Sequence, residues 1–101
     1  MSDTAELVVS ELVTNSLKCI WASEISSPVI LRVAADHKYL RIEVWDAVQR
    51  APVQRPHEID AESGRGLEII SMLCNHWDTF FPDSGGKIVR ATIEIDQGKD
   101  W

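Results

Sequence analysis

The spacing of apolar residues predicts a long amphipathic helix near the start of the chain. From Asp3 to about Trp21 they recur at steps of three and four residues, which places them on one stripe of a helix. The polar segment 2–4 offers capping residues before the helix. The stripe consists of Ala5, Val8, Val9, Leu12, Val13, Leu17 and Ile20.

An alternating pattern then predicts a β-hairpin, with strands at 29–36 and 39–46. In the second strand Leu40, Ile42 and Val44 share one face, and Arg41, Glu43 and Trp45 share the other. Asp46 falls on the apolar side, where a carboxylate is costly unless a donor reaches it. Two interpretations stay open: a solvated loop residue just past the strand, or a carboxylate that binds a ligand amine such as the exocyclic amino group of adenine.

The remaining pattern predicts a second helix and two further strands. Residues 47–66 carry two prolines and little periodicity, and so long a connection in a small domain suggests a lid or mobile loop. A strand is expected at 77–82, a turn at 83–87 and a last strand at 88–95. The predicted fold class is α+β, a two-layer α/β sandwich of two helices against an antiparallel or mixed sheet. The second helix is marked by Leu67, Ile70, Leu73 and Cys74, and the inward residues of the last strand are Val89, Ala91, Ile93 and Ile95.

Composition narrows the class of protein. A chain of 101 residues predicts one domain spanning 1–101. Hydrophobic residues make up 45% and charged residues 26%, with no apolar run of membrane-spanning length and no signal peptide, so we expect a cytoplasmic protein without a membrane partner. The net charge of -6 argues against direct binding of nucleic acid. Cys19 and Cys74 lack metal-ligand spacing, which favours structural burial.

Two short motifs offer candidate chemistry. Glu11 and Asn15 lie one helical turn apart and therefore point the same way. An amide oxygen can bind Mg²⁺ while a carboxylate orients or deprotonates a hydroxyl, although surface polar residues are the alternative. Gly64-Arg65-Gly66 precedes a helix start, where backbone N–H groups and the helix dipole bind anions, although an ordinary turn is the alternative.

Four segments together resemble the GHKL ATP-binding fold, which is shared by gyrase, Hsp90, MutL and histidine kinases. Within it they are most similar to the anti-sigma-factor serine/threonine kinase branch. The match covers nearly the whole chain in the right order and implies a Bergerat-type fold with ATP and Mg²⁺ as cofactors. The segments are "ELVVSELVTNSLKC", "LRIEVWD", "ESGRGLEIISML" and "GGKIVRATIEI".

The resemblance also implies a function and the roles of individual residues. The function is an ATP-binding regulatory protein that phosphorylates a serine on an anti-sigma antagonist and sequesters a sigma factor, so both are expected protein partners. Lys18 faces the phosphates in this interpretation, although a solvated helix lysine is the alternative. The implied roles are Mg²⁺ binding for Asn15, general base for Glu11, adenine recognition for Asp46, and phosphate binding for Gly64, Arg65, Gly66 and the N–H of Leu67.

Two departures from the family pattern keep a second function open. The first is Val48, which stands where the family commonly has a glycine and therefore predicts a narrowed or weakened adenine pocket. The chain also begins almost at its first helix, so we expect it to lack the N-terminal strand and helix of the family. We therefore expect an exposed sheet edge and apolar surface, covered by a partner or a second copy unless the chain is truncated. The alternative function is a non-catalytic protein-interaction module of the same fold, with nucleotide binding lost or weakened. A fragment of a larger sensor kinase is a further alternative.

Strand parity and aromatic content give the remaining expectations. Thr92 is expected on the outward face and Ala91 toward the site. Trp45 is expected to point outward, whereas Trp21 and Trp77 are expected in the core or covering an edge.

Overall fold

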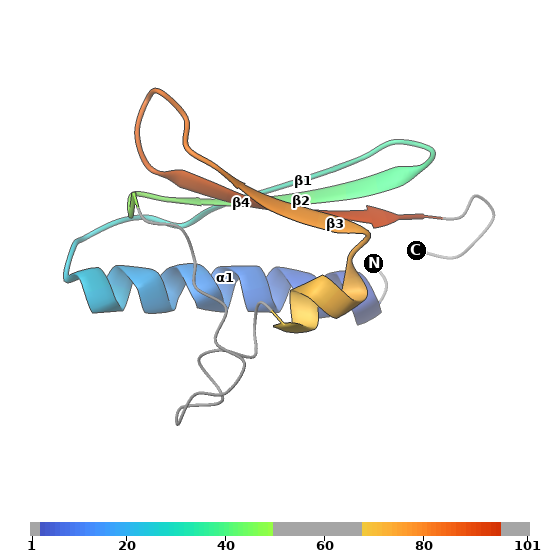
Figure 1. The fold of residues 1–101 in the computed structure, drawn as a ribbon, viewed down its shortest axis with the longest axis horizontal. Helices are drawn as coiled ribbons and strands as arrows, with labels where there is room; N and C mark the ends of the chain where they lie inside the picture. The colour runs from blue at the N-terminus through green and yellow to red at the C-terminus, as the bar shows by residue number, and fades with distance from the viewer. Residues whose placement is uncertain (1–2, 50–67, 96–101) are drawn as a thin grey trace.

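The computed structural model describes residues 3–49 and 68–95, which form a helical layer against a four-stranded antiparallel sheet (Figure 1). The two-layer α+β fold expected from the sequence is confirmed. The proposed phosphate-binding residues 64–67 and most of the expected loop 47–66 lie outside the described residues. The elements are α1 Asp3–Ser23, β1 Ile30–Ala35, β2 Tyr39–Asp46, β3 His76–Phe80 and β4 Lys87–Glu94, with residues 68–73 also helical.

The strand order β1-β2-β4-β3 places β2 and β4 at the centre of the sheet. The predicted hairpin is confirmed, since β1 pairs antiparallel with β2. Its turn is held by Asp36, whose Oδ1 accepts the backbone N–H of Tyr39 at 2.7 Å and that of Lys38 at 2.8 Å. These two hydrogen bonds, that from Tyr39 first, lower the pKa of Asp36 below its usual value.

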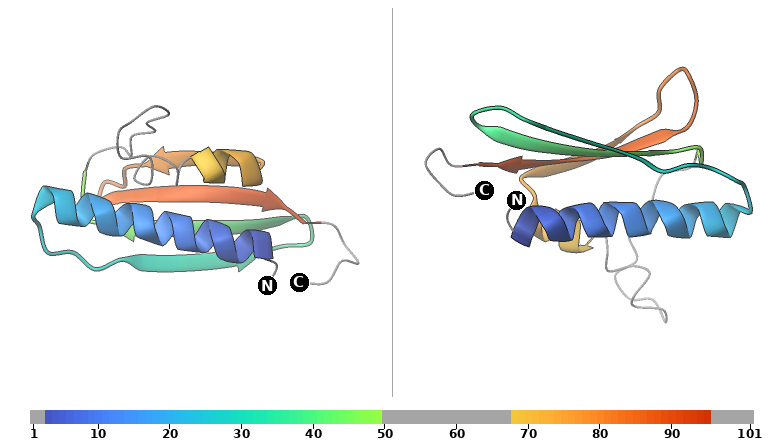
Figure 2. Two further views of the ribbon diagram at one scale, coloured as in Figure 1. Left: turned by 90° about the horizontal axis from the view of Figure 1, so that it is seen from below. Right: turned by 180° about the vertical axis from the view of Figure 1, so that it is seen from behind.

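The core lies between α1 and the two central strands (Figure 2). Alternation along β2 and β4 directs every second side chain toward α1. The fully or almost fully buried apolar residues of this layer are Ala5, Val8, Leu12, Leu40, Ile42, Val44, Ile70, Val89, Ala91 and Ile93.

Helix α1 does not cover the edge strand β1. Leu31 and Val33 pair with Val44 and Ile42 and therefore share their face of the sheet. They are nevertheless 45% and 41% exposed, because α1 packs on β2 and β4. The described residues thus contain the exposed edge and apolar surface that we expected. Trp21 is 87% exposed on α1, so the expectation that it packs in the core is wrong.

The opposite face of the sheet carries a row of charges that crosses all four strands. Arg32, Glu43, Arg90 and Asp78 are successive cross-strand partners. Arg90 lies 3.5 Å from Glu43 and 3.3 Å from Asp78, and Arg32 lies 3.9 Å from Glu43. Alternating signs make each of these cross-strand pairs attractive. The charged residues of this row therefore face away from α1, and Glu43 lies on the face of β2 that the alternation predicted.

Candidate functional site

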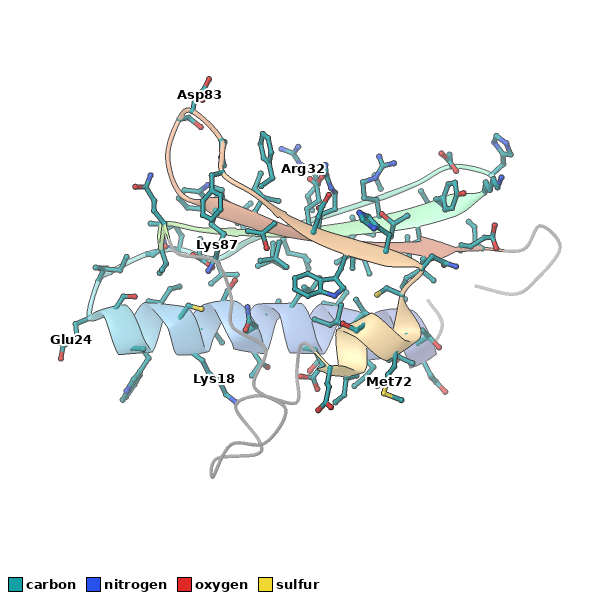
Figure 3. The ribbon with its side chains drawn as sticks, viewed as in Figure 1. Lys18, Glu24, Arg32, Met72, Asp83 and Lys87 are labelled. Carbon is teal, nitrogen blue, oxygen red and sulfur yellow. The ribbon has the colours of Figure 1, made fainter. Side chains whose placement is uncertain are left out.

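The most unusual feature of the core is a buried pair of opposite charges where β2 ends and β4 begins. Asp46 and Lys87 are direct cross-strand partners, so both side chains point toward α1. Both side chains are 0% exposed, and Lys87 Nζ lies 3.4 Å from Asp46 Oδ2. Figure 3 shows Lys87 at the sheet end that lies over the C-terminal half of α1.

Two glycines position Lys87 opposite Asp46. Gly85 and Gly86 have φ angles of 108° and 82°, in the left-handed region that favours glycine. A Cβ on Gly86 would lie 2.5 Å from the Trp45 ring and 2.6 Å from the carbonyl oxygen of Asp46. The indole N–H of Trp45 also donates to the Gly85 carbonyl at 3.0 Å. The turn therefore holds the first residue of β4 tightly against the end of β2.

The surroundings of Asp46 settle one of the alternatives left open by the sequence. Its carboxylate is buried on the α1 side of the sheet, so the interpretation as a solvated loop residue is wrong. The backbone N–H of Val48 donates to Oδ1 at 2.9 Å. Within residues 3–49 and 68–95, Oδ2 has no hydrogen bond, and the ammonium of Lys87 lies 3.4 Å from it. Oδ2 therefore keeps unused capacity to accept a hydrogen bond, and recognition of a ligand amine by Asp46 stays a prediction.

Helix α1 brings Glu11 and Asn15 to one flank of its buried stripe. At about 100° per residue, these two residues lie between the buried Val8 and Leu12 and the exposed side of the helix. Both are half-buried, and Asn15 Nδ2 is fully buried without a partner. The shared orientation is the one that the motif predicted. Their catalytic and Mg²⁺-binding roles stay predictions.

Four buried polar side-chain atoms lack a hydrogen-bond partner in the described part of the chain. Two belong to adjacent residues of α1, and two belong to the charge pair on the facing strands. Such atoms are rare in folded proteins, and each has unused capacity to bond to a water, an ion or a ligand. They are Asn15 Nδ2, Ser16 Oγ, Asp46 Oδ2 and Lys87 Nζ.

The third α1 candidate, Lys18, is exposed, and its side chain points away from the sheet (Figure 3). Its direction separates it from the Asp46–Lys87 pair, so its proposed phosphate contact stays a prediction.

Magnesium would need ligands beyond those of α1. Within residues 3–49 and 68–95, no three His, Cys, Asp or Glu side chains form a group that could hold a metal ion. A Mg²⁺ ion at Asn15 would therefore take its remaining oxygen ligands from nucleotide phosphates and water, which is how this ion is commonly bound. The amide oxygen and the half-buried carboxylate of Glu11 fit this donor chemistry.

Together, the helix-on-sheet layers and the buried polar atoms between them define a two-layer domain with a candidate ligand site inside the sandwich. Comparison with known protein families identifies the class of protein to which this domain belongs. The chain belongs to the histidine kinase-like ATPase domain family, whose pattern matches residues 2–93. A search of curated proteins found no match. Among the described helices, none combines the length and apolar character required to cross a bilayer.

Sequence reasoning missed Lys87 because it placed this residue in the turn before the last strand. The observed strand begins one residue earlier, at Lys87. The signal was present in the parity of the strand, since Lys87 stands two residues before Val89 and therefore belongs to its buried face. Only the pairing of β4 with β2 shows that this lysine meets Asp46.

Proposed function

We propose that this domain binds ATP with Mg²⁺ between α1 and the adjoining ends of β2 and β4, and that it serves a cytoplasmic regulatory protein. The observation that supports this proposal most directly is the set of unpartnered buried polar atoms from Asn15, Asp46 and their neighbours. Two of these atoms belong to Asn15 and Asp46, the residues to which the family resemblance assigns Mg²⁺ binding and adenine recognition. Membership of the histidine kinase-like ATPase family supports the same ligand.

In this proposal each residue has a separate task. Asp46 accepts the amino group of adenine through Oδ2, because Oδ1 already accepts the Val48 N–H. Asn15 holds Mg²⁺, which would neutralise phosphate charge when bound. The N–H groups of residues 64–67 bind the phosphates, and Lys18 adds a positive charge at the outer side of α1.

We further propose that the protein is a serine/threonine kinase that phosphorylates an anti-sigma antagonist. Glu11 lies one helical turn before Asn15 on α1, and the proposal assigns both residues to the phosphate end of the site. From there its carboxylate can orient and deprotonate a serine hydroxyl beside the terminal phosphate. This catalysis depends mainly on positioning, so Glu11 would contribute to turnover more than to ATP affinity.

Calorimetric titration with ATP and Mg²⁺ tests the binding proposal. Wild type should release or absorb heat on binding, and Asn15→Ala and Asp46→Asn should each weaken affinity roughly tenfold or more, as expected for a lost charge-assisted contact. Asp83→Asn is the matched control, because Asp83 is an exposed turn residue outside the site. If folded wild-type protein gives no binding heat, ATP binding is excluded.

A phosphoryl-transfer assay tests the kinase proposal separately. Wild type is incubated with labelled ATP and an anti-sigma antagonist that carries the acceptor serine. Glu11→Gln should retain ATP binding but lose most of the transfer, because an amide cannot accept the hydroxyl proton. Equal transfer by wild type and Glu11→Gln would remove the general-base role, and ATP binding without any transfer would remove the kinase function.

The second candidate function is a non-catalytic interaction module with weakened nucleotide binding. The observation that favours it is the position of Lys87, which lies beside the oxygen of Asp46 that adenine would use. The exposed apolar residues of β1 supply a surface for a sigma factor, an antagonist or a second copy. This function predicts a complex or homodimer that is indifferent to ATP and survives Asn15→Ala, measured by light scattering. Loss of the complex in Leu31→Asp would locate the contact on β1.

A further inference from the structure

We infer that Lys87 is a built-in competitor for the base-binding carboxylate, so that a base binds only when the lysine side chain leaves Asp46. The inference rests on the proposed function, because it concerns the same site. It adds that the affinity for nucleotide is set by an ion pair within the protein. Lys87 thereby becomes a residue that determines the affinity of the site.

The first step is that the Lys87 ammonium and the amino group of a bound base would both need the same acceptor, Asp46 Oδ2. Asp46 Oδ1 accepts the N–H of Val48 at 2.9 Å, whereas Oδ2 has Lys87 Nζ at 3.4 Å and no hydrogen bond. An incoming amino group would donate to Oδ2 from hydrogen-bond distance. The lysine ammonium is also a nitrogen donor, so it occupies the position beside Oδ2 that the amino group of the ligand would need.

The second step concerns access. Asp46 and Lys87 are both 0% exposed, so neither side chain offers a free surface to a ligand from solvent. Binding at Oδ2 therefore requires a rearrangement. Lys87 is the group able to move, because its charge ends a flexible four-carbon stem.

The third step concerns what stays fixed. The Trp45–Gly85 hydrogen bond and the close approach of Gly86 to Trp45 hold the backbone on both sides of the charge pair. The cross-strand pairing of Asp46 with Lys87 belongs to the central strand pair of the sheet. The backbone of the strands is therefore held by contacts that do not involve the Lys87 side chain.

The fourth step concerns how firmly the lysine is held. Its ammonium has three N–H donors, yet Nζ makes no hydrogen bond in the described structure. A buried ion pair that is incompletely hydrogen-bonded recovers little of its desolvation cost. Lys87 can therefore be displaced by a ligand that gives Asp46 a better donor and allows the ammonium to reach water.

Replacement of Lys87 tests the inference. Lys87→Thr removes the competing ammonium, so it should bind Mg²⁺-ATP roughly tenfold or more tightly than wild type in calorimetry, while its thermal midpoint falls. A purely structural lysine would lower stability without tightening binding. Arg90→Gln is the matched control, because Arg90 lies on the same strand but on the opposite face of the sheet, and it should leave the affinity unchanged.

Each result decides the question. Tighter binding by Lys87→Thr supports the inference, and equal or weaker binding overturns it while leaving the proposed function intact. If neither wild type nor folded Lys87→Thr binds ATP, the proposed function fails and the inference fails with it.

A measurement on the wild type covers the case in which Lys87→Thr does not fold. Lysines are reductively methylated with and without saturating Mg²⁺-ATP, and their modification is measured by mass spectrometry. Lys87 should be protected in the free protein and become modified with ATP, whereas the exposed Lys38 serves as a reference that is modified in both. Continued protection of Lys87 at saturating ATP would overturn the inference.

Discussion

Lys87→Met should strongly destabilise the fold, because it leaves Asp46 as an unpaired buried charge. The Nζ–Oδ2 distance of 3.4 Å corresponds to an attraction of about 5 kcal/mol at an effective dielectric constant of about 20. Removing one partner of a buried ion pair typically costs about 3–5 kcal/mol. That loss is a large part of the ~5–15 kcal/mol that stabilises an ordinary domain. For a domain of this size it lowers the thermal midpoint by more than about 10 °C.

A double-mutant cycle with Asp46→Asn separates the charge pair from simple packing. Unfolding in urea, followed by circular dichroism, gives the free energy of unfolding of wild type, both single variants and the double variant. The double variant removes both charges, so its loss should fall short of the sum of the single losses by about 2 kcal/mol or more. Additive losses, or a cost of less than about 1 kcal/mol for Lys87→Met, would refute the argument that this pair is energetically coupled.

Three further predictions concern the frame of the site and its surroundings. Gly86→Ala should lower the stability measured by thermal unfolding more than Gly85→Ala does. Both substitutions strain a positive φ by about 1–2 kcal/mol, but only a Cβ at position 86 would clash with the Trp45 ring. Equal losses of stability would contradict this clash. Stability should fall with acid as Asp36 protonates, since its pKa is lowered by backbone hydrogen bonds, that from Tyr39 first. This contribution is present above about pH 4 and is lost below it, so Asp36→Asn should show a weaker acid dependence in denaturation. Burial raises the pKa of the Cys74 thiol to about 11, so its alkylation by iodoacetamide should accelerate about tenfold per pH unit between pH 8 and pH 10; a plateau below pH 9 would contradict that value.

Local periodicity was sufficient to predict most of the architecture. The steps of three and four in α1 and the alternation in β2 each record which side chains face the core, and the structure buries Leu12 and Ile42 accordingly. The placement of Asp46 on the apolar face followed from the same alternation. These features were predictable because each depends on neighbours in sequence.

Features that depend on distant segments were not predictable in the same way. The contact of Lys87 with Asp46 depends on the pairing of β4 with β2, which no local sequence pattern encodes. The exposure of Trp21 depends on where α1 lies across the sheet, since an aromatic residue in an amphipathic helix suggests burial by itself. The charge row that ends at Asp78 likewise requires the register of all four strands.

The most direct test of the account is a titration of isotope-labelled wild-type protein with Mg²⁺-ATP, followed by amide chemical shifts. If the nucleotide binds between α1 and the strand ends, the largest shifts should occur at Glu11 to Lys18, at Asp46 to Val48 and at Lys87. Amides in the middle of β1, such as that of Val33, should change little. Shifts concentrated on β1, or no shifts at saturating ATP, would contradict the proposed site.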